Sequence, residues 1–430
     1  MLHIGMITSI SYEKDLRIRK ELSALLKIGH QVSLCCLKKA RKEPHCTAIE
    51  GNFHIWRAAP SRTEGLGAVV SRSVNVASEW KASLEAFIQT RQPDVLHVGG
   101  LYLLPVAFFL AKRHGLPVVA DLYEDYPKAT RTAVFQLDGR RKGFLHRLRI
   151  KLQAEKVRLI ERWTLPRCAG VIIVVEEASE RLLRYKTNPN RIVVVSNTED
   201  ETTIGIPLER PSQASEPAGG VKEGSWRAIY FGGMGGFHRG IDTAIAAAGL
   251  ARDSIPGFSL QLVGCRKKQM EVYPRLISQA SAHDVVELMP WLPQKEGLRM
   301  VRSSDAALIP YHDIGHTNST VPHKLFQYML LGRPVVVSNV RPLQRIVESC
   351  ECGLVFEAGD PGDLARCLGY LYKHPQVARQ LGENGRRAAL GPYSWSNDSK
   401  RLCDLYHDIE EKQLEGQLPR PVWAEGRTEV

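Results

Sequence analysis

The sequence has no long apolar segment and no regular pattern of cysteines. Its longest apolar run, 101–111, is shorter than the roughly 20 residues that cross a bilayer. The amino terminus, MLHIGMITSI, lacks the basic segment of a secretory signal, so we expect a cytoplasmic protein. The nine cysteines are scattered, with only Cys35/Cys36 and Cys350/Cys352 close together, and neither a zinc motif nor a disulfide framework is predicted.

Two common cofactor signatures are also missing. There is no D-x-D motif and no cluster of histidines and carboxylates at metal-ligand spacing, so we expect no metal and no other cofactor. A dinucleotide fingerprint would need G-x-G-x-x-G, but counting from Gly233 its last position is His238, which disfavours NAD.

Positive charge, by contrast, is in excess and unevenly placed. The net charge is +12, and segment 140–167 has ten Lys and Arg against two glutamates. Apolar residues recur in it at helical spacing, which predicts an amphipathic helix with its leucines beneath the charges. Two interpretations are open: a solvated surface helix, or peripheral contact with an anionic membrane. Nucleic acid is not expected, because no interleaved aromatics or binding module accompany the charge.

Strands and helices alternate along the chain in two successive halves. Segments 171–175 and 192–195 are apolar on both faces, as are strands of a parallel sheet buried between helix layers. The first alternating half ends near Asn197, and the second begins at Trp226. This pattern predicts an α/β protein of two Rossmann-like, doubly wound parallel-sheet domains.

Composition sets the expected boundaries. We expect an amino-terminal domain over 1–200, a Pro-, Gly-, Ser- and Glu-rich linker over 201–225, and a carboxyl-terminal domain over 226–392. A helix over 393–412 and a flexible tail over 413–430 complete the chain.

In such sheets ligands gather at the carboxyl ends of the strands. After the strand AIYF comes the turn GGMGGFHRG, whose glycines would let a phosphate approach backbone N–H groups at a helix start. The predicted turn consists of Gly232, Gly233, Gly235 and Gly236, and Arg239 follows it. A purely structural turn is the alternative.

Lys324 stands in the first turn of a second predicted helix, HKLFQYMLLG. A lysine there is electrostatically unfavourable, because the helix dipole prefers negative charge at that end. Lys324 and Arg239 together could neutralise a pyrophosphate, whereas a solvated surface lysine is the alternative interpretation.

These segments resemble the retaining glycosyltransferases of family 4, whose GT-B fold has two Rossmann-like domains facing each other across a donor cleft. The resemblance covers nearly the whole chain. It rests on SISYEKDLRIRKELSALLKIGHQVSLCC, GGMGGFHRGIDTAI and, most specifically, VPHKLFQYMLLGRPVVVS. The resemblance implies that Arg239 and Lys324 bind the donor diphosphate and that the last helix crosses back onto the first domain.

The chain departs from the family pattern at three positions. Ser319 and Gln327 occupy the slots of two glutamates that face the donor sugar and the ribose, and Thr320 lies beside them. Tyr123 occupies a histidine slot, between Asp121 and Glu124, which are retained. A tyrosine, with an ordinary pKa near 10, cannot replace histidine as a base near neutral pH, but it could orient a hydroxyl.

The resemblance implies a metal-independent glycosyltransferase of polysaccharide or glycolipid biosynthesis. The donor would be a nucleoside-diphosphate sugar, and the acceptor a glycan or lipid-linked molecule. Asp121, Tyr123 and Glu124 would position acceptor or sugar, and Asp15 and Arg17 are acceptor-side candidates that could equally be helix-cap and surface residues. The alternatives are a nucleotide-sugar epimerase or hydrolase of the same fold, and an inactive relative that acts as a binding partner.

Overall fold

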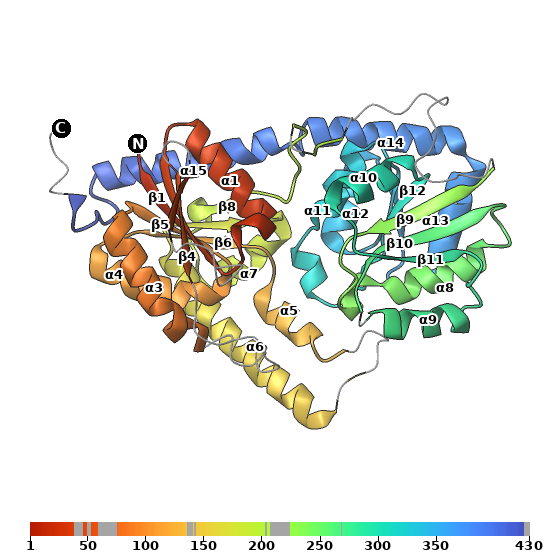
Figure 1. Cartoon of the computed structure of the whole chain (residues 1–430), viewed down its shortest axis with the longest axis horizontal. Helices are drawn as coiled ribbons and strands as arrows, with labels where there is room; N and C mark the ends of the chain where they lie inside the picture. Colours follow the sequence, from red (N-terminus) through yellow and green to blue (C-terminus); the bar gives the residue numbers. More distant parts are fainter. Residues whose placement is uncertain are drawn as a thin grey trace. The chain divides into compact units, whose positions relative to one another are not determined.

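Two α/β units, each built on its own parallel sheet, make up the protein. The computed structural model describes residues 1–37, 46–49, 53–58, 75–135, 141, 143–202, 204–206, 224–267 and 269–424. Unit 1 comprises Met1–Pro127, Lys151–Val195 and Asp398–Val430, and unit 2 comprises Lys128–Ile150 and Ser196–Asn397. The two doubly wound domains expected from the sequence are thus present (Figure 1).

The sheet of unit 1 has the order β3-β4-β2-β1-β5-β6-β7-β8. Its strands are β1 (His3–Thr8), β2 (Gln31–Leu37), β3 (Cys46–Ile49), β4 (Phe53–Ala58), β5 (Val95–Gly99), β6 (Val118–Leu122), β7 (Gly170–Ile173) and β8 (Ile192–Val194). All neighbours pair in parallel except β3 and β4. Strands β1, β5, β6 and β7 are buried along their whole length, which explains why most of their residues are apolar.

The helices of the amino-terminal half connect these strands. They are α1 (Leu16–Lys27), α3 (Asn75–Arg91), α4 (Leu104–His114), α5 (Tyr126–Thr132), α6 (Phe144–Thr164) and α7 (Ser179–Arg184). Helix α1 begins where the Asp15 carboxylate accepts a hydrogen bond from the backbone N–H of Ile18. The sequence assigned all of 1–200 to one domain, but residues 128–150 group with unit 2, because a sequence pattern does not report tertiary contacts.

Unit 2 has a six-stranded sheet in the order β11-β10-β9-β12-β13-β14, entirely parallel. Its strands are β9 (Trp226–Phe231), β10 (Phe258–Cys265), β11 (Val286–Pro290), β12 (Ala306–Ile309), β13 (Val335–Ser338) and β14 (Gly353–Phe356). Its helices are α8 (Ile241–Ala251), α9 (Gln269–Gln279), α10 (Gln294–Ser303), α11 (His323–Leu330), α12 (Arg341–Cys350), α13 (Pro361–Lys373) and α14 (Pro375–Leu390). If these six strands are numbered 1 to 6 along the chain, their order across the sheet is 3-2-1-4-5-6. This is the doubly wound order, and its switch point lies between β9 and β12.

The last helix, α15 (Trp395–Leu414), begins with residues of unit 2 and continues as part of unit 1 from Asp398. It packs against the strand β7, where Leu405 lies so close to Gly170 that a Cβ on this glycine would come within 2.8 Å of it. The chain then continues in contact with the end of α4, because the Val422 N–H donates to the carbonyl of His114 at 3.1 Å. Residues 413–424 of the predicted flexible tail are described, residues 425–430 lie outside the described residues, and the flexibility of the tail stays a prediction.

No helix among the described residues is both long enough and apolar enough to cross a membrane. The predicted linker falls mostly on 207–223, which also lie outside the described residues.

Candidate active site

In unit 2 two loops follow the neighbouring strands β9 and β12 at the switch point. The glycine turn follows β9 and leads through a short 3-10 helix, Phe237–Arg239, into α8. The loop after β12 passes through a second 3-10 helix, His316–Ser319, before α11 begins. The sheet therefore brings Arg239 and Lys324 to the same edge, as the alternation of strands and helices predicted.

The glycine turn needs glycine for two reasons. Gly232 and Gly236 have φ angles of 135° and 117°, in the region that disfavours side chains. A Cβ on Gly232 would also lie 3.2 Å from Nζ of Lys324. Gly233 has open space instead, since a Cβ there would meet no atom of the described chain within 4 Å, and Gly235 lies next to Gln269.

Lys324 is the central basic residue of this site. Its side chain is buried, with 7% of its surface exposed, and its Nζ lies 3.6 Å from the centroid of the Tyr230 ring. Among the described residues this amine has no hydrogen-bond partner. The Tyr328 hydroxyl accepts a hydrogen bond from the Phe231 N–H at 2.9 Å, which ties α11 to the end of β9 and fixes Lys324 beside the turn.

Arg239 is the second cation. Its guanidinium donates to the Tyr311 hydroxyl and lies 5.1 Å from the centroid of that ring. Burial, and to a smaller extent the charge of Arg239, lower the pKa of Lys324 well below its ordinary value. The guanidinium of Arg239 and a buried lysine amine without a hydrogen bond lie beside aromatic faces, and a bound anion would favour the protonated form of that lysine.

Two histidines lie beside these cations. His238 and His316 pack edge to face, with ring centroids 4.7 Å apart. Burial and the neighbouring Arg239 lower the pKa of His238 to about 2, so this ring is neutral at any working pH. His238 therefore adds no charge and can serve only as a hydrogen-bonding or packing group.

A carboxylate lies beside the predicted ribose slot. Glu199 accepts a hydrogen bond from Nε2 of Gln327 at 3.0 Å, and its side chain is 8% exposed. Asn197 donates to the carbonyl of Val321 at 2.7 Å, which holds the segment after β8 against the start of α11. The sequence analysis missed Glu199, because it stands at the edge of a Pro- and Ser-rich stretch that reads as a linker. Ser319 and Thr320 directly precede α11, Ser319 being buried and Thr320 half-buried.

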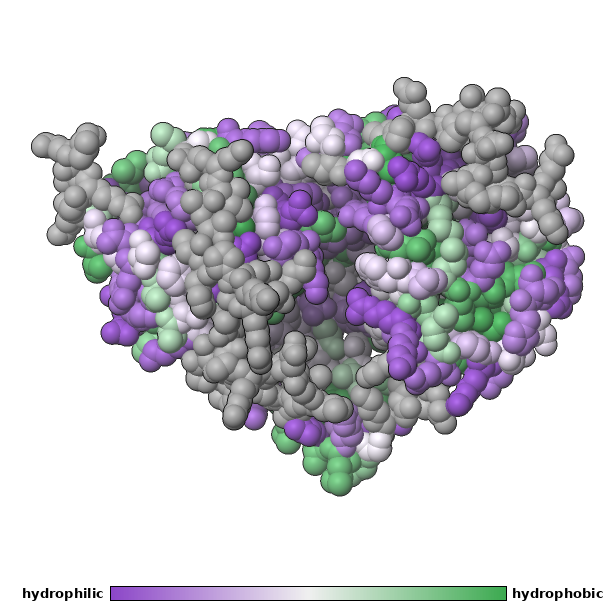
Figure 2. All heavy atoms as spheres, in the orientation of Figure 1, coloured by the Kyte–Doolittle hydropathy of each residue, from purple (hydrophilic) through white to green (hydrophobic). Residues whose placement is uncertain are grey.

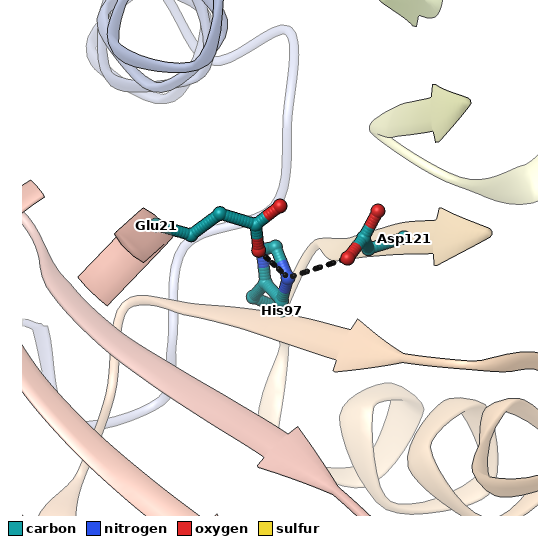
Figure 3. A group of neighbouring side chains, drawn as sticks. All are labelled: Glu21, His97 and Asp121. Atoms are coloured by element: carbon teal, nitrogen blue, oxygen red, sulfur yellow. Dashed lines mark ion pairs between the residues drawn. The ribbon is translucent and has the colours of Figure 1, made fainter. Parts of the chain in front are cut away.

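The predicted acceptor-side residues lie in unit 1, where they form a separate buried cluster. Arg17 donates to both carboxylate oxygens of Asp121 at 2.8 to 3.2 Å and lies 3.0 Å from the carboxylate of Glu21. Figure 3 shows His97 between the two carboxylates, with its Nε2 3.3 Å from Glu21 and 3.8 Å from Asp121. Burial alone would lower the pKa of His97, but the hydrogen bonds and charges of these carboxylates raise it to about 9.

This cluster bears on three expectations. Arg17 is buried rather than a surface residue. Asp121 is fully enclosed and is held by Arg17 and His97, so its role toward a substrate stays a prediction. Glu21, His97 and Asp121 lie within metal-ligand distance of one another, a grouping that their spacing in sequence conceals. In the described structure Arg17 and His97 balance the charges of both carboxylates.

The loop after β6 contains the other two candidates. Burial raises the pKa of Tyr123 well above its ordinary value, and the nearby carboxylates of Asp15 and Asp121 raise it further, so the phenol remains protonated. Glu124 is half-buried and lies two residues before α5. Asp15 is buried as the cap of α1 and also accepts from the Thr8 hydroxyl at 2.8 Å.

Comparison with known structures identifies the fold. Sucrose-phosphate synthase from Thermosynechococcus elongatus superposes with a TM-score of 0.74 at 16% identity, over 96% of this chain and all of the other (100%). HepE from Anabaena in complex with UDP-glucose gives a TM-score of 0.63 at 12% identity, over 95% of this chain and 100% of the other. The two parallel-sheet domains are thus those of the GT-B glycosyltransferase fold.

Family models identify the class. Residues 16–198 match a glycosyl transferase 4-like domain, and residues 215–388 match glycosyl transferases group 1. The chain belongs to the glycosyltransferases of the family 4 type. It is 29% identical over 133 residues to an MMP alpha-(1->4)-mannosyltransferase of Mycolicibacterium hassiacum, a match that covers 31% of each chain. The chain spans between 31% and 60% of the length of the curated relatives that it matches.

Proposed function

We propose that the protein transfers a sugar from a nucleoside-diphosphate sugar to a glycan or lipid-linked acceptor in the cytoplasm, with retention of configuration and without a metal. The observation that carries this proposal is the buried amine of Lys324, which has no hydrogen-bond partner among the described residues and would be charged most readily beside an anion. Arg239 lies beside it as a second cation that lowers its pKa. A diphosphate supplies the negative charge that both groups need. One solved neighbour, HepE from Anabaena, was obtained with UDP-glucose.

We assign a role to the residues around each part of the donor. Lys324 and Arg239 hold the diphosphate, and the open space at Gly233 admits a phosphate oxygen close to the backbone. Gln327 and Glu199 meet at 3.0 Å and present amide and carboxylate oxygens suited to the ribose hydroxyls. As the sugar–phosphate bond breaks, negative charge grows on the leaving diphosphate, and the two cations stabilise it.

The acceptor is assigned to the loop after β6. Glu124 is the carboxylate of this loop that is not enclosed, and Tyr123 stays protonated because burial raises its pKa. Tyr123 is therefore a hydrogen-bond donor rather than a base, and an oxygen of the leaving phosphate takes the acceptor proton. Asp121 is a positioning residue that keeps Arg17 in place.

The first experiment is isothermal titration calorimetry with UDP, GDP and ADP on the wild-type protein and on Lys324→Met. We expect tight binding of one nucleotide, weakened about 100-fold or more in the variant, since a charge-assisted contact to phosphate is worth roughly 2–3 kcal/mol. Lys373→Met, which removes an exposed lysine of α13, is the control and should bind like the wild type. No binding of any nucleotide, or equal binding by the Lys324 variant, would refute the proposal.

A second experiment follows the products with the sugar form of the bound nucleotide. Transfer to an added acceptor, with the anomeric configuration read by NMR and activity retained in EDTA, supports the proposal. Release of free or epimerised sugar without an acceptor would assign the protein to the hydrolases or epimerases of this fold instead.

A further inference from the structure

Helix α6 has two opposite apolar faces, of which only one is covered. At about 100° per residue, Ile150, Ala154 and Val157 fall on one side, where they are 0–4% exposed. The opposite side carries Leu145, Leu148, Leu152 and Leu159, which are 79%, 45%, 57% and 59% exposed. The sequence analysis predicted that these leucines pack beneath the charged residues, but in the structure the leucines are exposed and a different face of the helix is buried.

Aromatic residues stand at the two ends of this outward stripe. Phe144 is 70% exposed at the first residue of α6, and Trp163 is 51% exposed near the last. In Figure 2 apolar surface gathers at the lower tip of the view, where Figure 1 draws the amino-terminal end of α6. We call Phe144, Leu145, Leu148, Leu152, Leu159 and Trp163 the α6 stripe.

Basic side chains border the α6 stripe on both sides. By the same helical geometry, Arg149 and Lys156 lie along one edge, and Lys151, Arg158 and Arg162 lie along the other. All five of these residues are exposed. Arg140 and Lys142, which the sequence analysis included in the basic segment, lie outside the described residues.

On the outward side the acidic residues of α6 offset only one of these five charges, that of Arg158. Glu161 is fully buried on the covered side and lies 3.5 Å from Arg181. Glu155 is paired with Arg158 at 2.7 Å on the helix itself. The outward face is therefore apolar along its middle and positively charged along its edges.

These features select one kind of partner. A second copy of the chain, packed stripe to stripe, would bring rows of cations against rows of cations. A nucleic acid would match the charge but leave the leucines in water. An anionic lipid surface satisfies both, because acyl chains cover the stripe while the flanking Lys and Arg reach the phosphates.

We propose that α6 is a membrane-docking helix that lies in the plane of an anionic bilayer, with the α6 stripe in the boundary between headgroups and acyl chains. Trp163 sits at headgroup level, where amphipathic rings are favoured. The proposal stands on α6 alone and is independent of nucleotide binding in unit 2. The proposal requires that the apolar side chains of the α6 stripe insert into the bilayer. Attraction between the basic residues and anionic lipids is not sufficient for it.

The test is co-sedimentation of the full chain with vesicles of phosphatidylglycerol and phosphatidylcholine, compared with pure phosphatidylcholine. The stripe variant Leu145→Ser/Leu148→Ser/Leu152→Ser keeps every charge and changes only exposed residues. Its matched control is Leu183→Ser/Leu250→Ser/Leu390→Ser, which alters three exposed leucines outside α6. The edge variant Arg149→Gln/Lys156→Gln has Arg299→Gln/Lys373→Gln as its control.

We expect the wild type and both controls to bind the anionic vesicles and to bind neutral ones at least about tenfold more weakly. The stripe variant should lose about 100-fold in partitioning, because each buried methylene adds to membrane affinity. The edge variant should lose about thirtyfold at low salt. Lipids brominated on the acyl chain should quench wild-type fluorescence more than that of Trp163→Phe.

Three outcomes would overturn the proposal. The first is failure of the wild type to bind anionic vesicles, and the second is binding that the stripe variant leaves unchanged, which would mean adsorption by charge alone. The third is concentration-dependent dimerisation that the stripe variant abolishes, which would assign the stripe to a second copy of the chain. Circular dichroism and nucleotide calorimetry on each variant verify that the fold and the donor site are intact.

Discussion

The ring of His97 lies 2.7 Å from the hydroxyl of Tyr406, although 309 residues separate them. His97 is in β5 and Tyr406 in α15, and both are fully buried. This contact fastens the last helix to the sheet of unit 1 through the same imidazole that Glu21 and Asp121 hold from its other nitrogen.

Loss of this hydroxyl should therefore destabilise unit 1. Tyr406→Phe leaves a buried nitrogen of His97 without its partner, at a cost of about 1–3 kcal/mol. Urea unfolding followed by circular dichroism would measure it, with Tyr370→Phe at a 40% exposed tyrosine as the control. An unchanged unfolding midpoint in Tyr406→Phe would show that the hydrogen bond contributes nothing net.

The stability of unit 1 should decline at alkaline pH. The carboxylates overcome burial and raise the pKa of His97 from 6.5 to about 9, so its bound proton stabilises the fold fully below pH 6.5. This contribution disappears as pH rises from 6.5 through 9, at a slope of about 1.4 kcal/mol per pH unit for one proton. Thermal unfolding between pH 6 and 9.5 measures the decline.

Two histidine variants test whether His97 causes this decline in stability, one at His97 and one at a control position. In His97→Gln the slope should disappear, whereas His407→Gln, at an exposed histidine, should retain it. A pH profile that is the same in all three proteins would contradict the assignment of the buried proton to His97.

Nucleotide binding should take up protons. Burial and Arg239 lower the pKa of Lys324 in the free protein, and a bound diphosphate would raise it again. At pH 8 the heat of binding should therefore differ between phosphate and Tris buffers, whose ionisation enthalpies differ. If the variant Lys324→Arg still binds nucleotide, it should show no such difference, because arginine stays protonated. A buffer-independent heat in the wild type would mean that Lys324 is already charged.

Glu199 should determine how strongly the ribose is recognised. We expect Glu199→Ala to weaken binding of the nucleoside diphosphate about tenfold and to affect its 2′,3′-dideoxy analogue much less, because only the ribose hydroxyls can use the carboxylate. Calorimetry with both nucleotides measures this difference, and Glu201→Ala, at an exposed residue of the same segment, is the control. Equal losses for the two ligands would indicate that Glu199 only holds α11 in place.

A methyl group on the glycine turn should close the donor site. In Gly232→Ala the new Cβ would lie 3.2 Å from Nζ of Lys324, at a φ of 135° that alanine avoids. We expect at least a tenfold loss in nucleotide affinity and a loss of about 1–2 kcal/mol in stability. Gly233→Ala, where the Cβ meets no described atom within 4 Å, should keep its stability.

The periodicity of apolar residues, together with the glycines and prolines that end helices and strands, determined the class of fold. Alternating apolar strands and amphipathic helices follow from local chemistry, and they sufficed to predict two doubly wound sheets. The glycines after β9 and the lysine at the start of α11 could also be singled out from the sequence. Each is unfavourable for its local structure, since glycine weakens regular structure and the amino-terminal end of a helix disfavours positive charge. Residues that are unfavourable for their local structure can be recognised from the sequence alone.

Tertiary structure decided what depends on neighbours from elsewhere in the chain. One buried ion-pair network combines residues from three segments, which meet only when the sheet forms: Arg17, Glu21, His97 and Asp121. Their spacing in the sequence therefore does not predict the network. The leucines of α6 obey helical periodicity equally well whether they face the protein or water. Periodicity defines a face, but only packing against the rest of the fold selects which face is covered.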